Sequence, residues 1–131
     1  MDNSIFKNYD VRGIYPIQLD VEAASKIAQT FLMILKEETG KEIKDLHIIV
    51  GRDIRESSLP LMRAVMDIFM KYGVQIDDMG LVSINDLYFA NGYYKYDGGI
   101  VATASHNPPQ YGGFKLTTLS PDKKAIKFIS G

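Results

Sequence analysis

The sequence predicts an α/β fold, because amphipathic helical segments alternate with short apolar segments that suit buried strands. Two segments have apolar residues at helical spacing, 20–39 and 59–72. Three short apolar segments have the composition of strands, 46–50, 74–79 and 99–103. Segment 46–50 is almost continuously apolar, which is typical of a strand covered on both faces. We therefore expect an open sheet with helices packed against it.

Residues at both ends of each predicted helix support these boundaries. Asp20 is placed to cap the first helix, and Gly40 is a natural stop. Ser57 or Ser58 is placed to cap the second helix, which ends at Gly73. The helix limits are therefore predicted from local signals alone.

The remaining segments predict shorter elements. Residues 9–13 predict a strand that bends into a loop at its end, and residues 114–118 predict another strand. Residues 83–90 predict a third helix. A Ser-Pro-Asp sequence predicts the start of a last helix over 120–131.

Length and composition narrow the class of protein. The 131 residues suffice for one domain, and 46% are hydrophobic while 24% are charged, as in globular proteins. The formal net charge is −1 without a long basic run, so nucleic acid is not expected as a partner. No apolar segment is long enough to cross a membrane and no signal peptide is apparent, so we expect a cytoplasmic protein without membrane partners. The lack of cysteine excludes disulfides and thiolate metal sites.

One connection holds the residues of greatest chemical interest. After the predicted strand 99–103, Pro108 and Pro109 fix φ and lack an N–H, so they stiffen the chain that follows Ser105 and His106. Ligands usually bind at the carboxyl ends of strands in open α/β sheets. The sequence therefore predicts that Ser105 and His106 are held rigidly at a binding edge of the sheet.

Ser105 suits phosphoryl transfer better than acyl transfer. It lacks the Gly-x-Ser-x-Gly pattern of a hydrolase, and the adjacent His106 is expected to point to the opposite face of extended backbone. A phosphoserine would need nearby cations and hydrogen-bond donors. Lys115, on the returning strand, and Asn107 are candidates to supply them.

Three motifs make the chain resemble the α-D-phosphohexomutase family. Residues 103–109 with 111–115 are similar to the family's phosphoserine loop, and residues 9–16 and 51–58 are similar to its two other N-terminal signatures. The resemblance implies the family's domain I, a three-layer α/β/α sandwich around a mainly parallel, mixed sheet. It also implies that residues 1–131 are this domain alone, with domains II–IV absent from the chain.

The resemblance implies that a hexose 1-phosphate and a hexose 6-phosphate are interconverted through a phosphoserine and a hexose 1,6-bisphosphate. The motifs are more similar to the phosphomannomutase/phosphoglucomutase group than to phosphoglucosamine mutases. By this resemblance Ser105 carries the phosphoryl group, Lys115 is a general acid/base or charge partner, and His106 shapes the site. Mg²⁺ would bind the phosphate on Ser105 and take its other ligands from an absent domain, because no Asp-Gly-Asp-type loop is present.

The resemblance also assigns roles to the other two motifs. Phosphate would be bound by Arg12, Tyr9 and Asn107. The phosphoserine loop would be braced by Arg52, Asp53 and Arg55. Without the resemblance, Arg12 would be assigned to a solvated or ion-paired surface, and segment 51–58 to a capped helix start.

Two positions depart from the family's pattern. Gly112 stands where the family often has asparagine, so one donor side chain is missing and we expect reduced order over 110–113. Gly112 and Gly113 would also permit a tight or left-handed return of the chain. Ile84-Asn85 stands where the family commonly has Thr-Pro, so the shape of that loop is left open.

Two other functions remain open beside the mutase. One is a non-catalytic module that binds sugar phosphates, and the other is a docking domain for a separately encoded remainder through the aromatic residues of 88–96. For the mutase itself, we expect the isolated chain to fold but not to catalyse, because the family's cleft is built from four domains.

Overall fold

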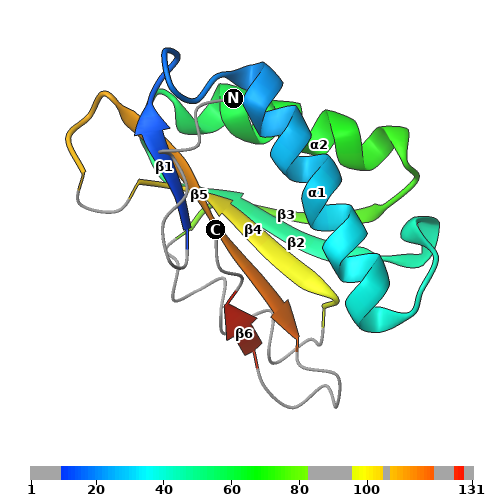
Figure 1. Ribbon diagram of the computed structural model, residues 1–131. Coiled ribbons are helices and arrows are strands. Elements are labelled where there is room, and N and C mark those ends of the chain that lie inside the picture. The colour runs from blue at the N-terminus through cyan, green and yellow to red at the C-terminus, as the bar shows by residue number, and fades with distance from the viewer. Residues whose placement is uncertain (1–9, 83–95, 105–106, 120–125, 129–131) are drawn as a thin grey trace.

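The computed structural model describes residues 10–82, 96–104, 107–119 and 126–128 (Figure 1). It contains two α-helices, α1 (Val21–Thr39) and α2 (Ser58–Lys71), and a short 3₁₀ helix, η2 (Ile43–Asp45). The strands are β1 (Asp10–Ile14), β2 (His47–Arg52), β3 (Gln75–Leu81), β4 (Gly98–Ala102), β5 (Tyr111–Leu119) and β6 (Ile126–Phe128). Within these residues, neither helix combines the length and apolar character that crossing a membrane requires.

The strands form one mixed sheet in the order β1-β5-β4-β2-β3, with β6 also paired to β5. β2 runs parallel to β3 and β4, whereas β5 is antiparallel to β4, β1 and β6. Helices α1 and α2 lie side by side over one face of the sheet (Figure 1). The predicted α/β fold with a mixed sheet is confirmed, and the helix predicted over 83–90 lies outside the described residues.

The core fills the space between the two helices and the sheet. α1 contributes Phe31 and Leu35, and α2 contributes Phe69, whose ring centroid lies 6.5 Å from that of Phe31. Burying each such side chain stabilises the fold by about 1.5–3 kcal/mol. At the start of β4, Gly98 allows α1 to pack closely, because a Cβ there would lie 2.9 Å from a methyl carbon of Leu35.

The ends of the first helix confirm the prediction. The side chain of Asp20 accepts a hydrogen bond from the Ala23 N–H at 2.8 Å, and Gly40 has φ +72° while its N–H bonds to Lys36 O. The start of α2 differs, because Ser57 occupies the N-cap position without a side-chain capping bond. The serines that were predicted to cap α2 are therefore engaged elsewhere.

The helix predicted over 120–131 is wrong at residues 126–128, which form strand β6. β6 pairs antiparallel with the second half of β5, with Thr117 opposite Phe128. β5 extends to Leu119, beyond its pairing with β1, so its backbone groups there can bond another strand. The sequence Ile126-Lys127-Phe128 also alternates with the period of a strand. Pairing with β5 therefore overrides the local helix signal.

Candidate functional site

The three sequence motifs meet at one edge of the sheet. The parallel strands β2 and β4 end side by side, and the Asp53 N–H donates to Ala102 O at 3.0 Å. β1 ends at the same edge, because Ile14 pairs with Tyr111, the first residue of β5. The connections that follow β1, β2 and β4 therefore leave the sheet together, where ligands bind in open α/β folds.

Arg12 and Asn107 are brought together across 95 positions of sequence. Val11 is buried under the helices, so the alternation of β1 directs Arg12 to the other face of the sheet. Arg12 Nη1 donates a hydrogen bond of 2.6 Å to Asn107 Oδ1. Because the guanidinium occupies the amide oxygen, the Asn107 NH₂ group is left to face another acceptor.

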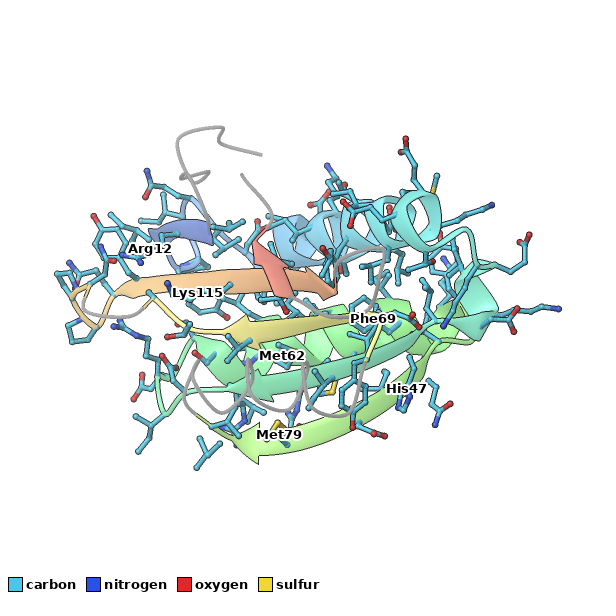
Figure 2. The ribbon with its side chains drawn as sticks, turned by 90° about the horizontal axis from the view of Figure 1, so that it is seen from below. Arg12, His47, Met62, Phe69, Met79 and Lys115 are labelled. Atoms are coloured by element: carbon cyan, nitrogen blue, oxygen red, sulfur yellow. The ribbon has the colours of Figure 1, made fainter. Side chains whose placement is uncertain are left out.

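Lys115 lies on the same face as Arg12. Its neighbours Phe114 and Leu116 are buried in the core under the helices, so Lys115 points the opposite way. Arg12 pairs with Gly113 in the register, two residues before Lys115, which makes the two cations diagonal neighbours. Figure 2 shows both side chains at the same end of the sheet. The structure thus gathers two cations and one amide at this edge.

Arg55 reaches from the second motif to the backbone of the third. Its Nη2 donates to Asn107 O at 2.7 Å, and its Nη1 lies 2.9 Å from Pro108 O and 3.4 Å from Tyr111 O. The side chain is only 13% exposed. A planar guanidinium can hold several acceptors at once, so Arg55 fixes both sides of the connection between β4 and β5.

Asp53 holds Arg55 in turn. Asp53 Oδ2 lies 3.3 Å from Arg55 Nε, and Oδ1 accepts bonds from the Arg55 N–H and from Ser58 Oγ. Ser57 Oγ donates to Tyr111 O at 3.3 Å. The sequence predicts that Ser57 or Ser58 caps α2, and no local signal distinguishes a capping serine from one that bonds another segment.

The other predicted site residues are placed differently. Arg52 Nη1 lies 3.5 Å from the carbonyl oxygen of the adjacent Asp53, which is a local contact. Tyr9, Ser105 and His106 lie outside the described residues, and their roles stay predictions. The structure therefore brings together Arg12, Asn107, Asp53 and Arg55, with Lys115 on the face of Arg12.

Gly112 and Gly113 serve close packing, not a left-handed return. Both lie inside β5, and the described glycines with positive φ are Gly40, Gly73 and Gly80. A Cβ on Gly113 would lie 2.1 Å from Val11 O. A Cβ on Gly112 would lie 2.8 Å from a methyl carbon of Leu61. Both residues pair with β1, and the expectation of reduced order over 110–113 stays a prediction.

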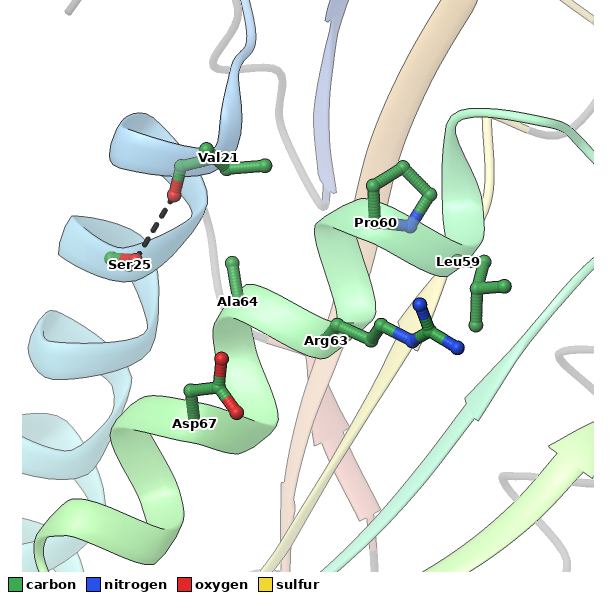
Figure 3. A pocket seen from close by; sticks show the side chains of 7 residues that line it. All are labelled: Val21, Ser25, Leu59, Pro60, Arg63, Ala64 and Asp67. Atoms are coloured by element: carbon green, nitrogen blue, oxygen red, sulfur yellow. Dashed lines mark hydrogen bonds between the residues drawn. The ribbon is translucent and has the colours of Figure 1, made fainter.

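Two cavities open near this edge. One, of about 500 Å³, lies between the second and third motifs and is lined by Asp53, Ile54, Arg55, Glu56, Asn107 and Pro109. The other, of about 440 Å³, lies between α1 and α2 and is lined by Val21 and Ser25 of α1 and by residues of α2 that include Ala64 and Asp67 (Figure 3). Only the first cavity is lined by predicted site residues.

The described residues do not form a metal site of their own. Among them, no three His, Asp or Glu side chains come close enough to hold an ion. At the loop edge, both oxygens of Asp53 already contact Arg55. Asp77 lies in β3 beside His47. The Tyr96 hydroxyl donates to this carboxylate and holds the pKa of Asp77 below its usual value. Partial burial opposes the lowering of the pKa, and His47 adds to it. Mg²⁺ therefore does not fit these residues without further ligands.

Comparisons with known proteins find matches along almost the whole chain. Residues 3–126 match the family model described as phosphoglucomutase/phosphomannomutase, alpha/beta/alpha domain I. The chain is 40% identical over 126 residues to a phosphomannomutase of Vibrio cholerae, covering 96% of this chain and 26% of that protein. It is 37% identical to a phosphoglucomutase/phosphomannomutase of Thermococcus kodakarensis, over 94% of this chain and 26% of that protein.

A solved structure gives the same picture. The crystal structure of a phosphoglucomutase/phosphomannomutase family protein from Burkholderia thailandensis matches with a TM-score of 0.79 and 33% identity. The match covers 100% of this chain and 28% of that one. The chain thus spans about a quarter of the length of these relatives.

Proposed function

Because this chain belongs to the phosphoglucomutase/phosphomannomutase family, as its α/β/α domain I, we propose that it is the phosphoserine-bearing part of an enzyme that interconverts hexose 1-phosphates and hexose 6-phosphates. The observation that carries the proposal is the meeting of the three motifs at one sheet edge, where Arg12 lies 2.6 Å from Asn107. A phosphoryl group needs cations and donors that are fixed before it arrives. The remaining domains of the enzyme would complete the cleft, as the length of the relatives suggests.

Ser105 is the proposed phosphoryl carrier. In one half-reaction a hydroxyl oxygen of the hexose monophosphate attacks the phosphorus on Ser105, the P–O bond to the sugar forms, and the P–O bond to Ser105 breaks. The proton of the sugar hydroxyl is given up, and Ser105 Oγ gains a proton. Lys115 would act as general acid/base at that oxygen or stabilise the charge, and His106 would shape the site. The resulting hexose 1,6-bisphosphate then transfers its other phosphoryl group back to Ser105, by the same step in reverse.

Arg12, Asn107 and Tyr9 are the proposed phosphate-binding residues. A guanidinium suits phosphate oxygens because it presents five donors in one plane. Its bond to the Asn107 amide oxygen supports this role, because it leaves the amide NH₂ to donate to an anion. Arg52, Asp53 and Arg55 are proposed to support the loop. In this proposal Mg²⁺ would bind the phosphate on Ser105. The other ligands of the ion would lie beyond the described residues.

Intact-mass measurement tests the proposal directly. After incubation with glucose 1,6-bisphosphate, the chain should gain one phosphoryl group, and Ser105→Ala should gain none. A second assay adds glucose 1-phosphate, Mg²⁺ and a coupling enzyme, and the isolated chain should show no turnover. Persistent absence of the added phosphate would reject the carrier role and favour a module that only binds sugar phosphates.

A further inference from the structure

The carbonyl oxygens of the connection 107–111 are almost all engaged by donors from outside the segment or across its turn. Asn107 O, Pro108 O and Tyr111 O lie within hydrogen-bond distance of the Arg55 guanidinium. Gln110 O accepts from the Tyr15 N–H at 2.9 Å. Four of the five carbonyl oxygens of residues 107–111 therefore accept hydrogen bonds from groups of the protein.

This arrangement matters for any anion bound at the edge. Carbonyl oxygens carry partial negative charge and repel phosphate, whereas N–H groups attract it. Because three carbonyl oxygens of the connection contact the Arg55 guanidinium, these acceptors all point toward one side chain. The Asn107 side chain is held separately, because its amide oxygen accepts a hydrogen bond of 2.6 Å from Arg12 Nη1.

Arg55 is suited to hold the backbone and poorly suited to bind the anion itself. Its Nε lies 3.3 Å from Asp53 Oδ2, and the Asp53 carboxylate offsets its charge. Its two terminal nitrogens already have the three carbonyls as acceptors. A lysine would keep the charge but could not reproduce this planar set of bonds.

We propose that Arg55 is a positioning residue for the phosphoryl site, which fixes the backbone of residues 107–111 so that Asn107 meets Arg12. The inference rests on the proposed carrier function of Ser105. Arg55 touches neither substrate nor phosphate in this scheme and acts through Asn107.

The experiment uses the whole 131-residue chain and the variants Arg55→Lys and Arg55→Ala. Arg63→Lys and Arg63→Ala are the matched controls, because Arg63 is exposed on α2 (Figure 3) and, among the described residues, makes no hydrogen bond to segment 107–111. The first readout is NMR-detected exchange of the Asn107 and Tyr111 amides, which bond Ala104 O and Pro108 O. The second is the rate of phosphoryl uptake from glucose 1,6-bisphosphate.

In both Arg55 variants, the amide hydrogens of Asn107 and Tyr111 should exchange at least about tenfold faster than in the wild type, since bonds to a charged group are lost. Amides of β2 should keep their wild-type rates. The maximal rate of phosphoryl uptake by Arg55→Lys should fall about tenfold or more, while the half-saturating bisphosphate concentration should change less than about twofold. Guanidinium ion at low concentration, but not ammonium, should restore part of the rate in Arg55→Ala. The Arg63 variants should match the wild type.

Wild-type amide exchange in both Arg55 variants would overturn the inference, as would a wild-type maximal uptake rate in Arg55→Lys. If the wild-type chain takes up no phosphate, the proposed function fails, and amide exchange alone decides the positioning role. If Arg55→Ala unfolds, as fast exchange in β2 would show, Arg55→Lys decides.

Discussion

The two ends of the sheet are both rich in charge but use it differently. Where β2 and β4 end, Arg55 bonds the backbone of a connection that has no regular structure at residues 107–110. Where these strands begin, Asp97 is 1% exposed and accepts bonds from the His47 N–H at 2.9 Å and from Lys41 Nζ at 2.8 Å. Figure 2 places His47 at the end opposite Arg12 and Lys115.

The contrast shows what a charged cluster can indicate. The His47 N–H donates to the Asp97 carboxylate, and the Asp97 N–H donates to His47 O. This cluster therefore joins the starts of two neighbouring strands. Asp53 and Arg55 instead immobilise a connection that lies over a cavity. Charge at a strand end is therefore evidence of a site only when it orders a segment that the sheet itself does not order.

The largest effect is expected at the loop end from Gly113→Ala. Its new Cβ would meet the backbone oxygen of Val11, which cannot move without separating β1 from β5. The free energy of unfolding should fall by about 3 kcal/mol or more. Gly112→Ala is the matched control and should cost about 1 kcal/mol, because the methyl end of Leu61 can move. Urea denaturation measures both, and equal losses would contradict the packing argument.

A smaller loss is expected from Asp53→Ala. This change leaves the Arg55 guanidinium, 13% exposed, without its carboxylate, and removes the acceptor of Ser58. The free energy of unfolding should fall by about 2–3 kcal/mol, and phosphoryl uptake should slow as well. Asp67→Ala, an exposed site on α2, should stay within about 0.5 kcal/mol of the wild type.

At the opposite end, Asp97→Ala should affect stability alone. It removes the acceptor of the His47 N–H and of Lys41, which should cost about 2 kcal/mol in urea denaturation. Phosphoryl uptake per folded molecule should equal that of the wild type. A slowed uptake would show that the two ends of the sheet are coupled and would contradict a purely structural role for Asp97.

The smallest effect is a pH dependence at Asp77. The Tyr96 hydroxyl lowers the pKa of Asp77 in the folded state, and His47 adds to this. Ionised Asp77 therefore contributes stability above the unfolded pKa of about 4, and this contribution is lost as pH falls through the folded pKa. Because Asp77 is 46% exposed, the contribution is small.

Urea unfolding of Tyr96→Phe and the wild type from pH 7 to pH 3 measures this contribution. The stability difference between them should shrink at the acid end. Asp77→Asn has no charge to lose and should show no such change when combined with Tyr96→Phe. A difference that stays constant over the whole range would contradict the assignment.

Much of the fold follows from local sequence signals. Asp20 and Gly40 bound α1 as predicted, because a cap and a left-handed stop depend on neighbouring residues alone. The strand at 126–128 could not be predicted, since it exists through its pairing with β5. The same holds for Gly113, whose lack of a side chain matters only because Val11 lies against it.

The site was predictable to a lesser degree. Arg12 and Asn107 are 95 positions apart, and only the motif order suggested that they belong together. Ser57 carries a hydroxyl suited to capping, yet its bond to Tyr111 O depends on where β5 begins. Residue type thus gives the chemistry that is available, while the sheet decides which groups meet.

The position of β5 has a consequence for the order of assembly. Strand β1, which carries Arg12, pairs along its length with residues 111–115, about a hundred positions later in the chain. A ribosome makes the N-terminal segment first, so β1 cannot pair with β5, its partner among the described strands, until residues 111–115 have emerged. The α1–α2 layer and the parallel strands can form earlier from nearer contacts, and the edge where Arg12 meets Asn107 is completed among the last native contacts of this domain.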